Sequence, residues 1–308
     1  MVGIRAACVT PGRRATMGSM APPLRFEAPT ALQFFAALVA DDDSLSLLEA
    51  AANVAQDEYP QLDTQGLLAQ VDALAHRLCQ RIPSDAAPLQ RMRLLNQYFF
   101  HELGFAGNVN DYYDPRNSYL PDVLATRRGI PITLAMLYVE LASQVGLSAC
   151  GVSFPGHFLV KLRMSRGEAV IDPFTGYSLS QQELEERLAP VRQQRGLLGD
   201  FDAPLGLFLQ PASAREVIAR LLRNLKAIHH VAAQWQRLLA VQERLVVLLP
   251  QSWEERRDRG LVLAEIGKMA RAQGDIADYL RHCPGAADAD ALRRRVAHWR
   301  QRGGPMRH

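Results

Sequence analysis

An apolar helix followed by three short extended runs, in the middle of an otherwise helical sequence, constrains the fold of this chain more than any other feature. The helix is predicted to begin at Ile130 or Pro131, because the first helical position tolerates the missing N–H of proline. Hairpin-type residues, Pro155-Gly156 and the segment 165–167, separate the extended runs. The runs cover residues 148–154, 157–164 and 168–174. A helix that leads into an antiparallel meander predicts an α+β core.

The sequence on both sides of this core is typical of helices. A strongly amphipathic helix follows Asp63, and its apolar stripe runs to Cys79, which we expect to be packed in the core. A second amphipathic helix covers about residues 89–103. Farther along the chain, serine–glutamate pairs at capping-box spacing predict three helix starts: Ser180–Glu183, Ser213–Glu216 and Ser252–Glu255.

These changes along the chain predict four units. The predicted core begins with a polar and aromatic segment, residues 106–120. Two interpretations of this segment are equally good: a loop that lines a binding site, or a strap that covers the core. The predicted units are a disordered tail (1–22), the helical N-terminal part of the core domain (23–105), the α+β core (106–205) and a helical repeat region (206–308).

The last unit contains a repeat. Pro250 and Pro284 lie 34 residues apart, and each closes an amphipathic helix. Gly260 and Ala272 are small enough to let two antiparallel helices approach closely, as in tetratricopeptide repeats, although an ordinary helical hairpin is the alternative. Because about three repeats are needed for independent stability, we expect residues 213–300 to pack against the core. The expected anchors, which could instead seal only the repeat region itself, are Leu221, Leu222 and Leu225.

The composition argues against several classes of protein. With 308 residues, 48% of them hydrophobic and 22% charged, the chain has the ordinary balance of a globular protein large enough for two domains. A net charge of +3 is too small to argue for a nucleic-acid or membrane partner. The four cysteines are scattered, which argues against a disulfide framework and a clustered zinc site, and we expect no metal and no cofactor. The first residues lack the apolar stretch of a secretory signal, so we expect a cytoplasmic protein whose translation starts at Met1, Met17 or Met20.

Two stretches of the core resemble a known family. They are NSYLPDVLATRRGIPITLAMLY, residues 117–138, and GVSFPGHFLV together with VIDPF, within residues 151–174. Both are similar to the SirB family of bacterial transglutaminase-like proteins, and the similarity runs from about Glu49 to the C-terminus, the helical repeats included. The resemblance implies a transglutaminase-like (papain-like) core, with a cysteine at the start of a core helix and a histidine and an acidic residue on adjacent strands.

One residue of this catalytic set is missing. His157 and Asp172 match the histidine and the acid, but Pro131 stands at the head of the helix, where the family fold places the cysteine. In such a triad the helix N-terminus favours the thiolate, the histidine moves its proton and the acid orients the imidazole. Without a thiolate, covalent acyl transfer is not open to His157 and Asp172. We therefore expect a relic dyad within hydrogen-bonding reach on adjacent strands, with the helix N-terminus pointing toward His157; a purely structural pair is the equally simple alternative.

Other candidate residues have weaker support. Cys150 lies on an extended run with no helix dipole behind it, and apolar burial makes a thiol inert. We expect the Thr133 hydroxyl to bond back to a helix carbonyl. His229 and His230 adjoin each other, so they cannot chelate one metal together, and we expect both at the surface.

These features predict a binding or regulatory protein without catalytic activity. Its partner is expected to be a protein that contacts residues 213–300, with no nucleic-acid or membrane partner. The alternative is a hydrolase or acyltransferase of the cysteine-protease-like superfamily that uses an atypical nucleophile.

Overall fold

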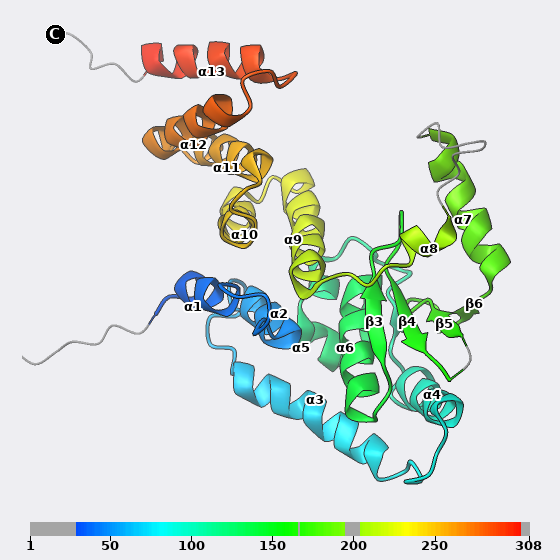
Figure 1. Ribbon diagram of the computed structural model, residues 1–308. Helices are drawn as coiled ribbons and strands as arrows, with labels where there is room; N and C mark the ends of the chain where they lie inside the picture. The colour runs from blue at the N-terminus through cyan, green and yellow to red at the C-terminus, as the bar shows by residue number, and fades with distance from the viewer. Residues whose placement is uncertain (1–28, 166, 195–203, 303–308) are drawn as a thin grey trace, which may run out of the picture.

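The computed structural model describes residues 29–165, 167–194 and 204–302 of the chain. The predicted tail, 1–22, lies outside these residues. Figure 1 shows a core of mixed helices and strands, from which a stack of helices rises toward the C-terminus. The predicted α+β core with an all-helical C-terminal region is confirmed.

The chain begins with helices that lie beside the core. Their bounds are α1 Ala31–Leu38, α2 Leu47–Ala55, α3 Thr64–Cys79 and α4 Pro88–Asn96, which continues as a π-helical turn, η1 Gln97–Glu102. The Asp63 carboxylate accepts the Gly66 N–H at 2.9 Å and so caps α3 where the sequence predicts. The buried stripe of α3 ends at Leu78. Cys79, the last residue of the helix, is exposed, and its Sγ lies 3.4 Å from the Gln144 carbonyl at the end of α6, so the expectation of a thiol packed in the core is wrong.

A pair of very short parallel strands leads into the central helix. The elements here are β1 Ala106–Gly107, the 3₁₀ helix η2 Pro115–Ser118, α5 Leu120–Thr126, β2 Arg128–Gly129 and α6 Pro131–Gln144. Pro131 occupies the first position of α6, as predicted. Helix α6 is buried over most of its surface, because α2 and α3 cover one side and the sheet covers the other.

The meander predicted after α6 is confirmed, with a fourth strand added. The strands are β3 Ala149–Val152, β4 Leu159–Arg163, β5 Glu168–Ile171 and β6 Ser178–Leu179, paired antiparallel in chain order. In this register Val160 of β4 lies opposite Gly151 on one side and Ile171 on the other. The helices that follow are α7 Gln181–Gln194 and α8 Leu205–Phe208.

The C-terminal region is a stack of helices. Their bounds are α9 Ala214–Val231, α10 Trp235–Leu248, α11 Trp253–Glu265, α12 Met269–His282 and α13 Ala289–Arg302. Gly260 of α11 lies so close to α12 that an added Cβ would be 3.0 Å from the Ile276 side chain. The prediction that small residues allow this close approach is confirmed.

Two of the three predicted capping boxes form, at Ser180 and at Ser213. The third, at Ser252, is wrong. Glu255 points away from the helix start and accepts a hydrogen bond from Lys226 Nζ of α9 at 2.7 Å. An ion pair between two helices therefore replaces the local cap.

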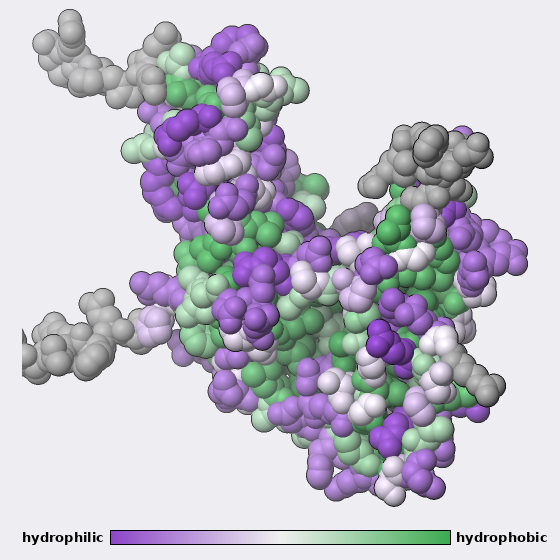
Figure 2. Space-filling model, viewed as in Figure 1, coloured by the Kyte–Doolittle hydropathy of each residue, from purple (hydrophilic) through white to green (hydrophobic). Residues whose placement is uncertain are grey.

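The first two helices of the stack dock on the core, as predicted. Leu221, Leu222 and Leu225 of α9 are fully buried in the same apolar cluster as side chains of α2 and α6. On α10 the guanidinium of Arg244 is buried and binds both carboxylate oxygens of Asp57, at 2.6 and 2.8 Å. Figure 2 shows the surface of the stack. Hydrophilic side chains predominate over α11–α13, and apolar side chains gather lower down, where α10 meets α1. Among the described helices, none is both long and apolar enough to cross a membrane.

Candidate functional site

His157 and Asp172 form a hydrogen bond. His157 Nε2 lies 2.8 Å from Asp172 Oδ1. The histidine sits in the turn before β4 and the aspartate directly follows β5. Because these strands are antiparallel, with Val160 opposite Ile171, the start of one meets the end of the other. The predicted contact is confirmed, with the two residues just beyond the strand ends.

The Asp172 carboxylate is the best-connected group of this pair. It is almost fully buried, and its Oδ1 also accepts the Phe174 N–H at 3.0 Å, while Arg187 of α7 lies 3.5 Å from Oδ2. Burial, the largest influence, raises the pKa of Asp172, but the hydrogen bond and charge of His157, the Phe174 N–H and Arg187 together hold that pKa below its usual value. The ionised carboxylate only accepts hydrogen bonds, so His157 Nε2 carries a proton and Nδ1 is the nitrogen left for proton transfer.

A helix of the repeat region holds the turn that carries the histidine. Arg220 of α9 donates to Ser153 Oγ at 2.8 Å and to the Phe154 carbonyl at 3.4 Å. Its guanidinium also lies over the ring of Phe158, 5.6 Å from the centroid. No sequence signal distinguished Arg220 from the other arginines, because its partners are more than sixty residues away along the chain.

The head of α6 is linked to the acid through the short parallel strands. The Gly107 N–H of β1 donates to the Phe174 carbonyl at 2.9 Å, and Gly107 pairs with Gly129 of β2. A Cβ at Gly107 would lie 2.3 Å from the Phe174 ring, so only glycine allows this approach. Two residues after Gly129 comes Pro131, which is buried. That the helix N-terminus points at His157 stays a prediction.

The alternative nucleophiles do not have the surroundings of an activated group. Thr133 is fully buried, and its Oγ1 lies 2.8 Å from the Asn117 carbonyl and 3.0 Å from the Ile130 carbonyl, so the expected bond to backbone is confirmed. Cys150 is half-buried on β3, where its Sγ lies 3.7 Å from the Lys161 carbonyl. Burial raises the pKa of the Cys150 thiol, which disfavours the thiolate.

A cavity of about 530 Å³ lies beside the head of α6. We call it the tyrosine cavity, because Tyr112 and Tyr113 line one wall. Ile130, the residue before Pro131, contributes to its lining. The Tyr112 ring centroid lies 5.9 Å from that of Phe174, so the cavity adjoins the segment that follows the acid. The remaining wall comes from α9 and the residue that caps its C-terminus, with Asn224, Ala227, Ile228, Val231 and Ala232. Of the two interpretations of residues 106–120, the lining of a cavity is the one that these contacts favour.

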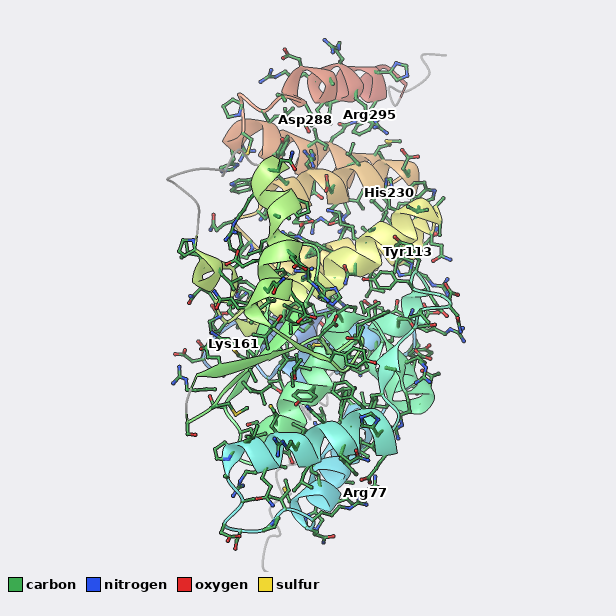
Figure 3. The ribbon with its side chains drawn as sticks, turned by 90° about the vertical axis from the view of Figure 1, so that its right-hand side faces the viewer. Arg77, Tyr113, Lys161, His230, Asp288 and Arg295 are labelled. Atoms are coloured by element: carbon green, nitrogen blue, oxygen red, sulfur yellow. The ribbon has the colours of Figure 1, made fainter. Side chains whose placement is uncertain are left out.

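A second cavity, of about 640 Å³, lies within the helical stack. We call it the repeat cavity; it is bounded by α9, α10, α11 and α13. Its apolar lining includes Trp235, Leu238, Leu261 and Val262, and its polar lining includes Lys226, His230, Gln242, Asp258, Glu265 and Arg295. Figure 3 shows Tyr113, His230 and Arg295 along one side of the molecule.

The two adjacent histidines of α9 differ in their surroundings. His230 lies at the surface and lines the repeat cavity, as expected. His229 is buried, with Nδ1 2.8 Å from Gln234 Oε1 and Nε2 3.4 Å from the Tyr119 hydroxyl, so the expectation of a surface position is wrong. Burial lowers the pKa of His229, which favours the neutral ring. Across the described part of the chain, no three His, Cys, Asp or Glu side chains are grouped to hold a metal ion.

Comparison with known families agrees with this architecture. Residues 65–223 match the transglutaminase-like superfamily, and residues 225–297 match a tetratricopeptide repeat family. The first match covers the dyad, α6 and most of α9. No solved structure matches the chain.

The chain is also similar to several curated bacterial proteins. A UPF0162 protein of Xylella fastidiosa (strain 9a5c) is 38% identical over 254 residues, which is 82% of this chain and 89% of the relative. A UPF0162 protein of Vibrio cholerae is 27% identical over 85% of this chain and 93% of its own length. The UPF0162 protein YchA of Escherichia coli K12 is 26% identical over 78% and 86% of the two chains. The chain therefore belongs to the transglutaminase-like superfamily, among the UPF0162 proteins.

Proposed function

We propose that this protein is a non-catalytic member of its superfamily that acts as a binding or regulatory module in the cytoplasm, with protein contacts through residues 213–300. We further propose that it belongs to the SirB family, whose motifs residues 117–138 resemble. The observation that carries the proposal is Pro131 at the first position of α6. A proline there offers no thiol, no hydroxyl and no N–H.

The surviving dyad has a structural reason to persist without catalysis. Asp172 ties together the turn before β4, the segment after β5 and α7, through His157, Phe174 and Arg187. A buried carboxylate needs such partners, because leaving it unpaired would cost several kcal/mol, on the order of 3–5. This role explains both residues without a reaction.

The second candidate function is a hydrolase or acyltransferase with an atypical nucleophile. It is favoured by the orientation of His157, whose Nε2 faces the acid and whose Nδ1 is left for proton transfer. It is weakened by the burial of Cys150 and by the bonded hydroxyl of Thr133.

Alkylation of the native protein with iodoacetamide separates the two functions. We expect every cysteine to react slowly, because none of the described thiols lies at a helix N-terminus beside a cation. One cysteine that reacts fast well below pH 8 would establish a thiolate nucleophile and overturn the non-catalytic proposal.

The variant Pro131→Cys tests the vacant position directly. If the proposed geometry is right, the new thiol should have a pKa about 1 unit or more below an ordinary cysteine, because the helix N-terminus and an imidazolium both favour thiolate. Ser44→Cys, on an exposed loop after three aspartates, is the control for an exposed thiol without a helix N-terminus, and its pKa should not lie below that of an ordinary cysteine. Adding His157→Gln to Pro131→Cys should raise the thiol pKa again. A pKa equal to that of the Ser44→Cys control would show that α6 does not point at the dyad.

A further inference from the structure

Arg220 of α9 has a half-buried guanidinium with one free edge. Its Nη1 donates to Ser153 Oγ at 2.8 Å and to the Phe154 carbonyl at 3.4 Å. Its Nε and Nη2 donate no hydrogen bond within the described part of the chain, and neither belongs to the unpartnered atoms that are closed to solvent there. A ligand can therefore reach both groups. The two N–H groups on this edge of a guanidinium are parallel and match the two oxygens of a carboxylate.

The charge of Arg220 has no counter-charge beside it. Among the described residues no aspartate or glutamate forms an ion pair with Arg220, whereas Arg215 and Arg223 on the same helix each pair with a carboxylate. Burial lowers the pKa of Arg220, so the surroundings of this guanidinium disfavour the charge that it carries. Tyr112, whose charge acts on Arg220, is a neutral phenol at pH 7. An anion at the free edge would supply the missing counter-charge.

The guanidinium stands at the core end of the tyrosine cavity. One face of α9 carries four residues at helical spacing, Arg220, Asn224, Ala227 and Val231, and the last three line the cavity. Arg220 is one turn, about 6 Å, from Asn224 along the helix. Tyr112 lies on the opposite wall; burial raises the pKa of Tyr112, and the nearby Arg220 opposes that rise. The free edge and the cavity are therefore parts of one site.

The cavity itself suits an apolar body. Its volume of about 530 Å³ is within the usual range for small-molecule sites, and none of its lining side chains in the described chain is charged. The side chains of Tyr113 and Val231 at its rim are 76% and 88% exposed, so a ligand would cover apolar surface that now faces solvent. Tyr113 is labelled in Figure 3. The Asn224 amide lines the cavity without a hydrogen bond inside the described chain and is not closed to solvent.

A single uncompensated cation selects the charge of the ligand. One guanidinium edge balances one negative charge, and the lining of the cavity adds no second cation. A phosphate monoester carries nearly two negative charges at pH 7 and would leave one of them without a partner. A carboxylate carries one.

We propose that the tyrosine cavity binds a small monocarboxylic acid with an apolar body. The carboxylate accepts hydrogen bonds from Nε and Nη2 of Arg220 and from the Asn224 amide. The body packs against Tyr113, Ile228 and Val231. This inference goes beyond the proposed function, which concerns protein contacts, and it holds with or without a protein partner.

Calorimetric titration of the full-length protein tests the site with two acids, phenylbutyrate and octanoate. Each acid is compared with its own neutral amide, which keeps the apolar body and loses the charge. We expect saturable one-to-one binding that is about tenfold or more tighter for the acid than for the amide. Added salt should weaken the binding of the acids and leave that of the amides unchanged.

Substitutions of Arg220 should remove the preference for the acid. Arg220→Met should bind phenylbutyrate no more tightly than its amide, a loss of about tenfold or more. Arg220→Lys keeps the charge but not the planar edge, so it should retain only part of the preference. Melting temperatures without ligand show whether each variant is folded. If Arg220→Met does not fold, Arg220→Lys decides, and a full preference for the acid in that variant would contradict the carboxylate contact.

Two controls separate the ligand contact from the structural role of Arg220. Ser153→Ala removes a hydrogen bond of Arg220 and keeps the guanidinium, so it should bind phenylbutyrate like the native protein. Arg223→Met removes a cation of the same helix that does not line the tyrosine cavity, and it should also bind normally.

The apolar end of the site has a separate variant. Tyr113→Ala should weaken the binding of phenylbutyrate and of its amide by the same factor, because it removes part of the wall that packs against the body they share. A change in the ratio of the two affinities would place the charge of the ligand at Tyr113 instead of Arg220.

Several results would overturn the proposal: no saturable binding of either acid, an acid that binds no more tightly than its amide, a preference for the acid that survives in Arg220→Met, or an equal loss of preference in Arg223→Met. Tighter binding of phenyl phosphate than of phenylbutyrate would refute the single charge. Tighter binding of an acetylated tripeptide with a free terminal carboxylate would refute the small molecule in favour of a polypeptide end. Each of these leaves the proposed function standing, because the alkylation experiment tests that function separately.

Discussion

Asp172 is a single residue on which several elements depend. Its carboxylate accepts hydrogen bonds from His157 and from the Phe174 N–H and lies near Arg187. Asp172 therefore connects the turn before β4, the segment after β5 and α7, whether or not the His157–Asp172 pair takes part in a reaction. The sequence could predict this contact because the resemblance placed both residues at the ends of neighbouring strands. It could not predict Arg187 or Arg220, since neither has a local pattern that reports a partner on another element.

The variant Asp172→Asn should lower the free energy of unfolding by about 1–3 kcal/mol at pH 7, because the charged hydrogen bonds become neutral ones. The folded-state pKa of Asp172 lies below its unfolded value of about 3.9. Its contribution is therefore complete above about pH 5, begins to fall as the unfolded-state carboxylate takes up its proton, and is lost as the pH falls through the folded-state pKa. Urea unfolding of both proteins from pH 7 to pH 3 measures the difference. A difference that stays constant over this range would mean that the ionised carboxylate is not what stabilises the fold.

At the scale of single elements, most of the local signals predicted the structure correctly, although the helical periodicity that ends at Cys79 did not predict the exposure of that residue. The start of α6, the meander and the caps at Ser180 and Ser213 all depend on neighbouring residues, and all were predicted correctly. The cap at Ser252 failed because Glu255 is held by cations of another helix. His229 was misplaced for a similar reason, because its burial depends on Tyr119, more than a hundred residues earlier.

Helix α10 provides a test of how the stack is fixed to the core. Arg244→Met should destabilise the protein by about 1–3 kcal/mol, because it removes both hydrogen bonds to Asp57 and leaves the buried Asn53 Oδ1 without the donor that Arg244 supplies. The matched control is Arg237→Met on the same helix. Its pair with Glu58 is partly exposed, so that change should cost less than about 1 kcal/mol. Chemical denaturation of both variants measures their free energies of unfolding. Equal losses for Arg244→Met and Arg237→Met would contradict the role of Arg244 in fixing the stack to the core.

The whole molecule has one main apolar core that extends from α1 to α10, and the outer helices α11–α13 add smaller clusters of their own. The sequence predicted that the repeat region packs against the core, because so few repeats cannot bury enough apolar surface to be stable alone. It could not indicate which face does so, since the decisive contacts join residues far apart in the chain.

A truncation after Gln210 tests this organisation. The shortened chain should aggregate or melt at a clearly lower temperature, because the core side chains that cover Leu221, Leu222 and Leu225 become exposed. A truncation after Gly285, which removes only α13, should leave the main core intact and is the control. An unchanged melting temperature after the longer deletion would show the stack to be an independent appendage. Calorimetry and light scattering provide the measurements.

The hydrogen bonds of Arg220 to the turn that carries His157 limit where chimeras of related proteins can be joined. A chimera that joins the core of one relative to the repeats of another at about residue 205 would replace Arg220 together with α9, and with it the bonds to Ser153 and Phe154. A junction placed in the turn after Leu249 keeps α9 and α10 with the core that they pack against, provided that the donor of α11 retains Glu255 and Asp258 as the partners of Lys226. We therefore expect the chimera joined after Leu249, in which only α11–α13 are exchanged, to fold, and the chimera joined at about residue 205 to be destabilised.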